Sequence, residues 1–212
     1  MSEDLIIKHC SPTLAGLKTA NLFTCVYAQK QDVERYTQEF NRRFSHKGVK
    51  MQPLGYGEKR ALIYVFRPTQ LERDLSDPQA RSILASMGYK SFDSKSCLNR
   101  LKSRVKKCPE FPHEIGLFLG YPPEDVRGFI LHKGNCCKCC GCWKVYGNEE
   151  KARCAFAKYK KCSDIYYSKW LQGTPINKLV VKKGSVTLHP ITPVEQLILS
   201  ESDSNGVVKT MM

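Results

Sequence analysis

The order of apolar and polar positions in the first third of the chain predicts a strand, a helix and two more strands. Residues 20–28 (ANLFTCVYA) are rich in strand-forming side chains. Residues 32–45 repeat apolar positions at the spacing of one helical face. Residues 49–54 and 60–66 are strand-like again, and residues 55–58 (GYGE) between them have the composition of a hairpin turn. The pattern therefore predicts the order β-α-β-β.

Helical patterns dominate the rest of the chain. An amphipathic helix is expected over residues 4–10, with a second short helix starting at Ser11-Pro12. Further helices are expected over residues 69–74, 78–87, 94–107, 115–119 and 124–131. A fourth strand is expected over residues 142–146, followed by a long helix from Asn148 to about Leu171. We therefore predict an α+β fold with a small antiparallel sheet in ferredoxin-like β-α-β-β-α-β order and extra helices inserted before the last strand.

The length of the chain and its termini suggest one domain in the cytoplasm. The chain has 212 residues, and we expect a single α+β domain over residues 1–184 and a poorly ordered, polar tail over residues 185–212. No apolar run approaches the roughly 18–20 residues that a membrane span needs, and the acidic start MSED does not resemble a signal peptide. Eleven cysteines, an odd number, in a chain with ample apolar content fit free thiols or a metal site better than a disulfide scaffold.

The net charge of +14 favours an acidic or anionic partner, because 34 Lys and Arg face only 20 Asp and Glu. Six of the basic residues lie between residues 94 and 109, where there is no acid before Glu110. One interpretation is a nucleic-acid-binding face, assisted by the Lys158–Lys161 run and by stacking on Tyr56 or Tyr64. The other is a solvated helix face, since four apolar positions in the segment form a stripe that leaves the charges outside: Cys97, Leu98, Leu101 and Val105. We favour the second.

Three blocks of sequence resemble a known family. They are HCSPTLAGLKTANLF at 9–23, FPHEIGLFLGYPPEDVRGFI at 111–130 and CGCWKVYG at 140–147, supported by KYKKC at 158–162. Together they are similar to the bacterial family catalogued as domain of unknown function 3793, which has no established activity. The resemblance implies a cytoplasmic protein of anaerobic bacteria, encoded near flavodoxins and iron-handling proteins. In the segment 136–142 that family usually has a single cysteine, aligned with Cys139, so the other cysteines are particular to this chain.

The strongest local chemical signal is a cluster of cysteines with metal-ligand spacing. Three overlapping C-x-x-C pairs occur in one segment formed by Cys136, Cys137, Cys139, Cys140 and Cys142. This spacing lets two thiolates turn onto one soft metal, and zinc or iron would suit it. A closed site needs further ligands, but Cys154 and Cys162 point to different sides of the predicted helix. Reduced thiols without a metal are the alternative. Covalent haem attachment is excluded because Trp143, not histidine, follows Cys142.

Two other pairs of residues are candidate catalytic groups. His113-Glu114 lacks the second histidine of a zinc protease motif, since Leu117 occupies that position, so the pair either projects into a site or only caps a helix. Cys10 follows His9 and precedes a helix start, which suits a reactive thiol, but it also has the spacing of a core residue.

Five further residues are weak candidates for ligand binding: His9, Lys18, Asn21, Trp143 and Lys144.

The best-supported function is a non-enzymatic thiol or metal-binding accessory module linked to redox or iron metabolism. The alternatives are a basic nucleic-acid-binding protein and a small-molecule enzyme that uses Cys10 and His113 around a pocket lined by Trp143 and Tyr121. We expect the three family-like blocks to meet at one end of the sheet if they share a site.

Overall fold

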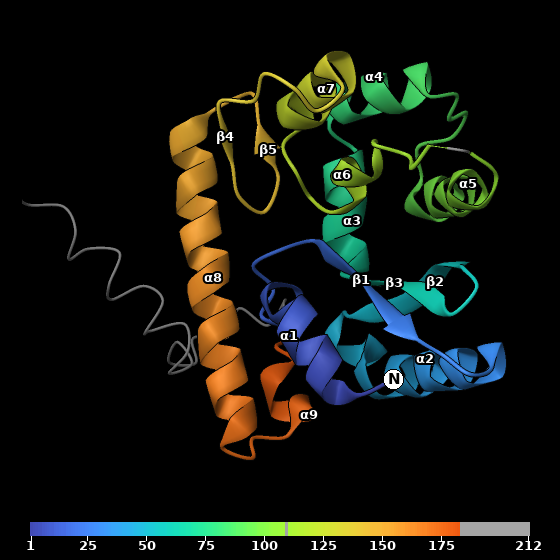
Figure 1. Ribbon diagram of the computed structural model, residues 1–212, viewed down its shortest axis with the longest axis vertical. Coiled ribbons are helices and arrows are strands. Elements are labelled where there is room, and N and C mark those ends of the chain that lie inside the picture. Colours follow the sequence, from blue (N-terminus) through green and yellow to red (C-terminus); the bar gives the residue numbers. More distant parts are fainter. Residues whose placement is uncertain (109, 183–212) are drawn as a thin grey trace, which may run out of the picture.

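The computed structural model describes residues 1–108 and 110–182, and a three-stranded antiparallel sheet lies at its centre (Figure 1). The strands are β1 (Ala20–Val26), β2 (Lys50–Tyr56) and β3 (Arg60–Phe66), in the spatial order β1-β3-β2. β3 is the middle strand and pairs with β1 from Arg60 opposite Val26 to Phe66 opposite Ala20. The predicted hairpin between β2 and β3 is confirmed.

Alternation of side chains along β3 divides the molecule into two cores. Ala61, Ile63 and Val65 enter a core on one face of the sheet. Tyr64 and Phe66 enter a second core on the other face. Because successive side chains of a strand point to opposite faces, one apolar strand supplies both cores.

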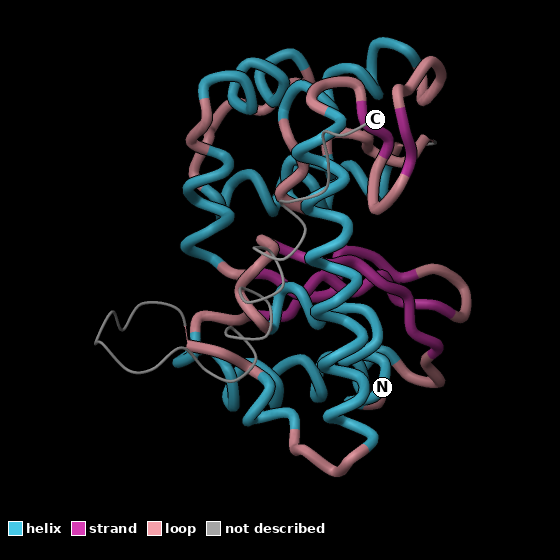
Figure 2. Tube along the Cα trace, turned by 90° about the vertical axis from the view of Figure 1, so that its left-hand side faces the viewer, coloured by secondary structure: helices cyan, strands magenta, loops and turns pink. Residues whose placement is uncertain are grey.

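Helices cover both faces of the sheet (Figures 1 and 2). The first core is closed by α1 (Glu3–Leu14), α2 (Lys30–Phe44), α8 (Glu149–Leu171) and α9 (Ile176–Leu179). The 3₁₀ turn η1 (Ser45–Lys47) follows α2 and has no buried residue. The second core is closed by α3 (Pro68–Leu75), α4 (Pro78–Ser86), α5 (Ser94–Lys107), α6 (Ile115–Phe118) and α7 (Pro123–His132). The long helix α8 packs against α1 at one end and extends to a small hairpin, β4 (Cys139–Cys140) with β5 (Lys144–Val145), at the other.

The α+β class is confirmed, but the ferredoxin-like order is not. The strand expected over residues 142–146 shortens to Lys144–Val145 and pairs with Cys139–Cys140 in a separate two-stranded sheet. Gly141 closes a tight turn by donating its N–H to the Trp143 carbonyl at 3.0 Å, and hydrogen bonds from the hairpin to the distant Asp125 hold this turn in place, so the segment pairs with itself. The helix expected over residues 4–10 and the second short helix expected to start at Ser11-Pro12 form one continuous helix, α1, which contains Pro12.

The basic segment has the structure of a solvated amphipathic helix. Cys97, Leu98 and Leu101 of α5 are buried in the second core and Val105 packs against it, as the apolar stripe predicts. Tyr64 is fully buried, which contradicts its suggested role in base stacking.

A buried arginine ties the end of α1 to the end of the described chain. Arg67 is 2% exposed, and its guanidinium donates to the carbonyl oxygens of Thr13 at 2.7 Å, Leu14 at 2.6 Å and Val181 at 2.8 Å. Carbonyl groups at the end of a helix lack intrahelical partners, and a cation there also complements the helix dipole. Arg67 therefore anchors the first core.

In the described part of the chain, no helix combines the length and the apolar character that a bilayer span requires. The predicted tail, residues 185–212, lies outside the described residues, and the domain boundary at residue 184 stays a prediction.

Candidate functional site

The hairpin β4–β5 brings one pair of cysteine thiols together. The Sγ atoms of Cys137 and Cys140 lie 3.3 Å apart. The other two pairs with the same sequence spacing, 136/139 and 139/142, show no such contact among the described residues. The structure therefore selects one of the three overlapping C-x-x-C pairs.

The backbone before the hairpin turns sharply to present this pair. Lys133 (φ 49°), Gly134 (φ 79°) and Cys136 (φ 56°) all have left-handed backbone conformations. Such a conformation is unfavourable for a non-glycine residue by about 1–2 kcal/mol. At the other side of the pair, Gly141 faces the ring of Phe156 from α8, and a Cβ atom there would lie 2.2 Å from that ring. Both ends of the thiol segment are thus fixed.

A single buried carboxylate holds the hairpin against α7. Asp125 is 2% exposed and accepts three hydrogen bonds of 2.7 Å, from the indole Nε1 of Trp143 and from the backbone N–H groups of Tyr146 and Gly147. The Lys144 ammonium adds a further tie by donating to the Gly134 carbonyl at 2.6 Å. These contacts give the thiol pair a rigid support.

Both thiols of the pair are accessible. Cys140 is exposed and Cys137 is half-buried. The hydrogen bond with Cys137 raises the pKa of the Cys140 thiol. Cys154 is exposed and Cys162 is buried in the first core, so they point to different sides of α8 as predicted. Within residues 1–108 and 110–182, no group of three or more His, Cys, Asp or Glu side chains is arranged to hold a metal.

A mostly apolar cavity of about 360 Å³ lies between this hairpin and helices α6 and α7. Tyr121, Phe129 and Trp143 supply its aromatic lining, and the candidates His113 and Lys144 lie at its wall. The predicted association of Trp143 with Tyr121 is confirmed, since their rings stack at 4.8 Å between centroids.

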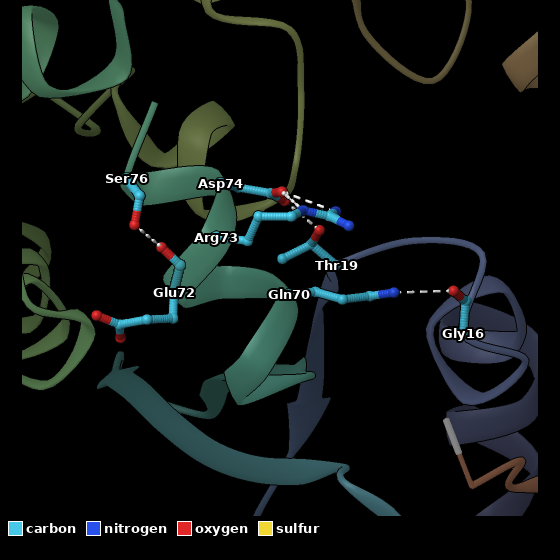
Figure 3. Close-up of polar contacts among 7 residues, drawn as sticks. All are labelled: Gly16, Thr19, Gln70, Glu72, Arg73, Asp74 and Ser76. Atoms are coloured by element: carbon cyan, nitrogen blue, oxygen red, sulfur yellow. Dashed lines mark hydrogen bonds and ion pairs between the residues drawn. The ribbon is translucent and has the colours of Figure 1, made fainter. Parts of the chain in front are cut away.

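A second, polar cavity of about 490 Å³ lies on the other side of Tyr121. Lys18, Thr19 and Asp74 line it together with Tyr159 of α8. Figure 3 shows its polar wall, in which the Thr19 hydroxyl and the Arg73 guanidinium both donate to the Asp74 carboxylate.

Lys18 has the most unusual environment in either cavity. Its side chain is 7% exposed, and its ammonium lies 5.1 Å from the ring centre of Tyr121 and 6.0 Å from that of Tyr159. Burial lowers the pKa of Lys18 to about 8, against the opposing effect of the Cys142 and Cys10 thiols. A lysine with this pKa carries its charge only partly at slightly alkaline pH.

The three family-like blocks meet around Tyr121, beside the start of β1. The ammonium of Lys18 from the first block and the indole of Trp143 from the third both contact the ring of Tyr121 from the second. The Tyr121 hydroxyl also donates to the Cys142 carbonyl at 3.2 Å. Segments that are distant in sequence therefore build one region.

The remaining candidates lie elsewhere. Cys10 is fully buried in the first core, and burial raises the pKa of its thiol, so it has the environment of a core residue. His9 stacks on Phe23 at 5.5 Å. Asn21 accepts a hydrogen bond of 2.7 Å from Thr13. None of these three candidates lines either cavity.

Glu114 has a structural environment. It is 1% exposed, forms an ion pair with Arg104 and accepts a hydrogen bond of 3.0 Å from the Tyr89 hydroxyl. Its side chain makes no capping bond at α6. Glu114 therefore joins α5 to the segment before α6 instead of facing a ligand.

The sequence pattern alone does not identify Asp125 or Tyr159 as site residues. Asp125 reads as an acid in the first turn of a helix, where the dipole alone explains it. Tyr159 reads as part of the apolar stripe of α8. The hydroxyl group of a tyrosine in that stripe is the feature that could have indicated a site, since buried tyrosines usually need a hydrogen-bond partner.

Comparison with known proteins identifies similarity to one family. The family described as "Protein of unknown function (DUF3793)" matches residues 6–180. No curated protein and no solved structure shows a significant match.

Proposed function

Since the chain belongs to the DUF3793 family, whose description names no activity, we propose a function from its own geometry: Cys137 and Cys140 bind a soft metal ion as two thiolates. This assigns the protein the role of a metal-binding accessory module, in line with a link to redox or iron metabolism.

The distance of 3.3 Å between the two Sγ atoms carries the proposal. Two thiolates at about 2.3 Å from a tetrahedral zinc ion are about 3.8 Å apart, so a shift of about half an ångström would admit the metal. Thiolates favour zinc, copper(I) and iron over harder cations. Binding would release the thiol protons, because the ligand is the thiolate.

Exposure of the pair supports an accessory role over a structural one. A structural zinc site is closed by four protein ligands, whereas only two thiols meet in the part of the chain that the structure describes. The other coordination positions would be filled by water, a small thiol or a partner protein. An open site of this kind suits metal uptake and transfer.

Anaerobic metal titration tests the proposal. Reduced full-length protein is titrated with Zn²⁺, and separately with Fe²⁺, against a chromophoric chelator. We expect one high-affinity site that is lost in C137S and in C140S. The matched controls C136S and C142S remove a neighbouring thiol of the same cluster, and we expect them to retain the site. Absence of binding to the wild-type protein, or equal losses in all four variants, would overturn the proposal.

The two alternative functions gain no comparable support. Nucleic-acid binding rests on the net charge of +14, and Tyr64 is buried. An enzyme that uses Cys10 with His113 requires a shared cavity, but His113 lies at the apolar cavity and Cys10 in the first core.

A further inference from the structure

We propose that the polar cavity binds a small carboxylate-bearing molecule, with the Lys18 ammonium as its counter-charge and the Tyr159 hydroxyl as a hydrogen-bond donor. This site is separate from the thiol pair and does not depend on it.

The unpaired state of Lys18 is the first argument. Its ammonium forms no hydrogen bond and no ion pair with any described residue, although Lys18 is only 7% exposed. Buried charges in proteins are normally paired, because an isolated charge in a low-dielectric environment is costly. A lysine held in this way and facing a cavity is suited to receive an anion.

The neighbouring acids do not neutralise Lys18, because each has other partners. The Asp74 carboxylate accepts from Thr19 and Arg73 (Figure 3). The Asp77 carboxylate caps α4 by accepting from two backbone N–H groups at its start. The lining thus contains opposite charges, yet only the ammonium lacks a partner within the described chain.

The two tyrosines define the geometry around Lys18. Their rings lie on the ammonium at 5.1 and 6.0 Å, a cation–π arrangement that orients a lysine without neutralising it. The Tyr121 hydroxyl is engaged with the Cys142 carbonyl, whereas the Tyr159 hydroxyl has no hydrogen bond to a described residue. Burial raises the pKa of both phenols to about 12, so both keep their protons at neutral pH.

One cation and one hydroxyl donor match the two oxygens of a carboxylate. A phosphate brings a second negative charge and further oxygens, which would face the Asp74 carboxylate across the same cavity. The volume of about 490 Å³ is within the range of roughly 300–1,000 Å³ for small-molecule sites. The expected ligand is therefore a small organic acid and not a polyphosphate.

Saturation-transfer NMR on the full chain tests this proposal. The probes are acetate and benzoate as sodium salts, with inorganic phosphate detected by ³¹P line broadening and with sodium chloride to match ionic strength. We expect transfer to at least one carboxylate, and at least a tenfold weaker affinity in K18M. K158M is the matched control, because Lys158 is an exposed lysine on the same helix as Tyr159, and its affinity should equal that of the wild-type protein.

Y159F provides a second variant that keeps the charge of Lys18, and we expect a three- to tenfold loss. Binding of phosphate without either carboxylate would overturn the ligand class. No binding to the wild-type protein, or equal binding to K18M, would overturn the site. C137S leaves the cavity intact and should bind carboxylate normally, so this result stands apart from the metal titration.

Discussion

Replacing Lys18 with methionine should stabilise the protein at neutral pH. Methionine is an unbranched side chain of similar length that fills the same space without a charge. The wild-type residue is 7% exposed and its ammonium has no ion pair with any described residue. The substitution therefore removes an unfavourable buried charge instead of a stabilising contact, which is the opposite of what most buried substitutions do.

The magnitude follows from the pKa of Lys18. Burial lowers it from 10.5 to about 8, and each unit corresponds to about 1.36 kcal/mol, so the charged form is disfavoured in the folded state by about 3 kcal/mol. Between pH 8 and 10.5 the unfolded chain binds more protons than the folded one, so wild-type stability rises with pH across that window. Below about pH 8 the full penalty applies. K18M should therefore be more stable than wild type by about 2–3 kcal/mol at pH 7, and this advantage should shrink towards pH 10.5.

Urea denaturation at pH 7 and at pH 10 measures the effect, with K158M as the exposed control that should change stability by less than about 0.5 kcal/mol. Ionisation of groups that do not face Lys18 affects wild type and K18M alike, so the difference between the two free energies of unfolding reports Lys18 together with the thiols and phenols that face it. If K18M is less stable than wild type by the same amount at both pH values, Lys18 stabilises the fold through packing and the predicted charge penalty is wrong.

Four further predictions concern Lys18, the thiol hairpin and the buried Arg67. Carboxylate binding, measured by NMR titration, should weaken as the pH rises through about 8, because only the protonated form of Lys18 attracts an anion. The other ionisable groups that face this lysine are those of Cys10, Arg73, Asp74, Asp77, Tyr121, Cys142 and Tyr159. D125N should lower the free energy of unfolding by about 2 kcal/mol and shift the indole N–H signal of Trp143, since an amide NH₂ cannot accept the indole hydrogen bond. C136G should raise stability by about 1 kcal/mol in urea without changing zinc affinity, because glycine adopts the left-handed conformation at no steric cost. R67M should lower stability by about 3 kcal/mol in the same assay, since it leaves buried carbonyl groups without a donor.

Local signals in the sequence predict most of the helices and strands. Asn148 is predicted to cap the long helix, and its side chain does accept from the Lys151 N–H at 2.9 Å. The apolar stripe of residues 94–107 predicts which face of α5 is buried. Contacts between residues one or two helical turns apart determine these features, so they can be predicted without knowing which distant segments pack against the helix.

The hairpin at residues 136–145 could not be predicted in the same way. Its conformation depends on Asp125, which lies 18 residues before Trp143 in the chain and bonds to it, and on Phe156, which packs against Gly141. The selection of Cys137 and Cys140 from three equal spacings is a result of that long-range support. The pattern of cysteines alone contains no information about it.

The two proposed sites differ in how far they should extend through the family. The sequence resemblance predicts that family members share the blocks that contain Lys18, Tyr121 and Trp143, and that a typical member has a single cysteine, aligned with Cys139, in the segment 136–142. Because the thiol pair needs Cys137 and Cys140, metal binding is expected to be particular to this chain and its nearest relatives. A family member with a single cysteine in that segment should bind carboxylate in the polar cavity and show no high-affinity zinc site. If such a protein binds zinc as tightly as this one does, the ligands lie elsewhere and the assignment of the metal site to the hairpin is wrong.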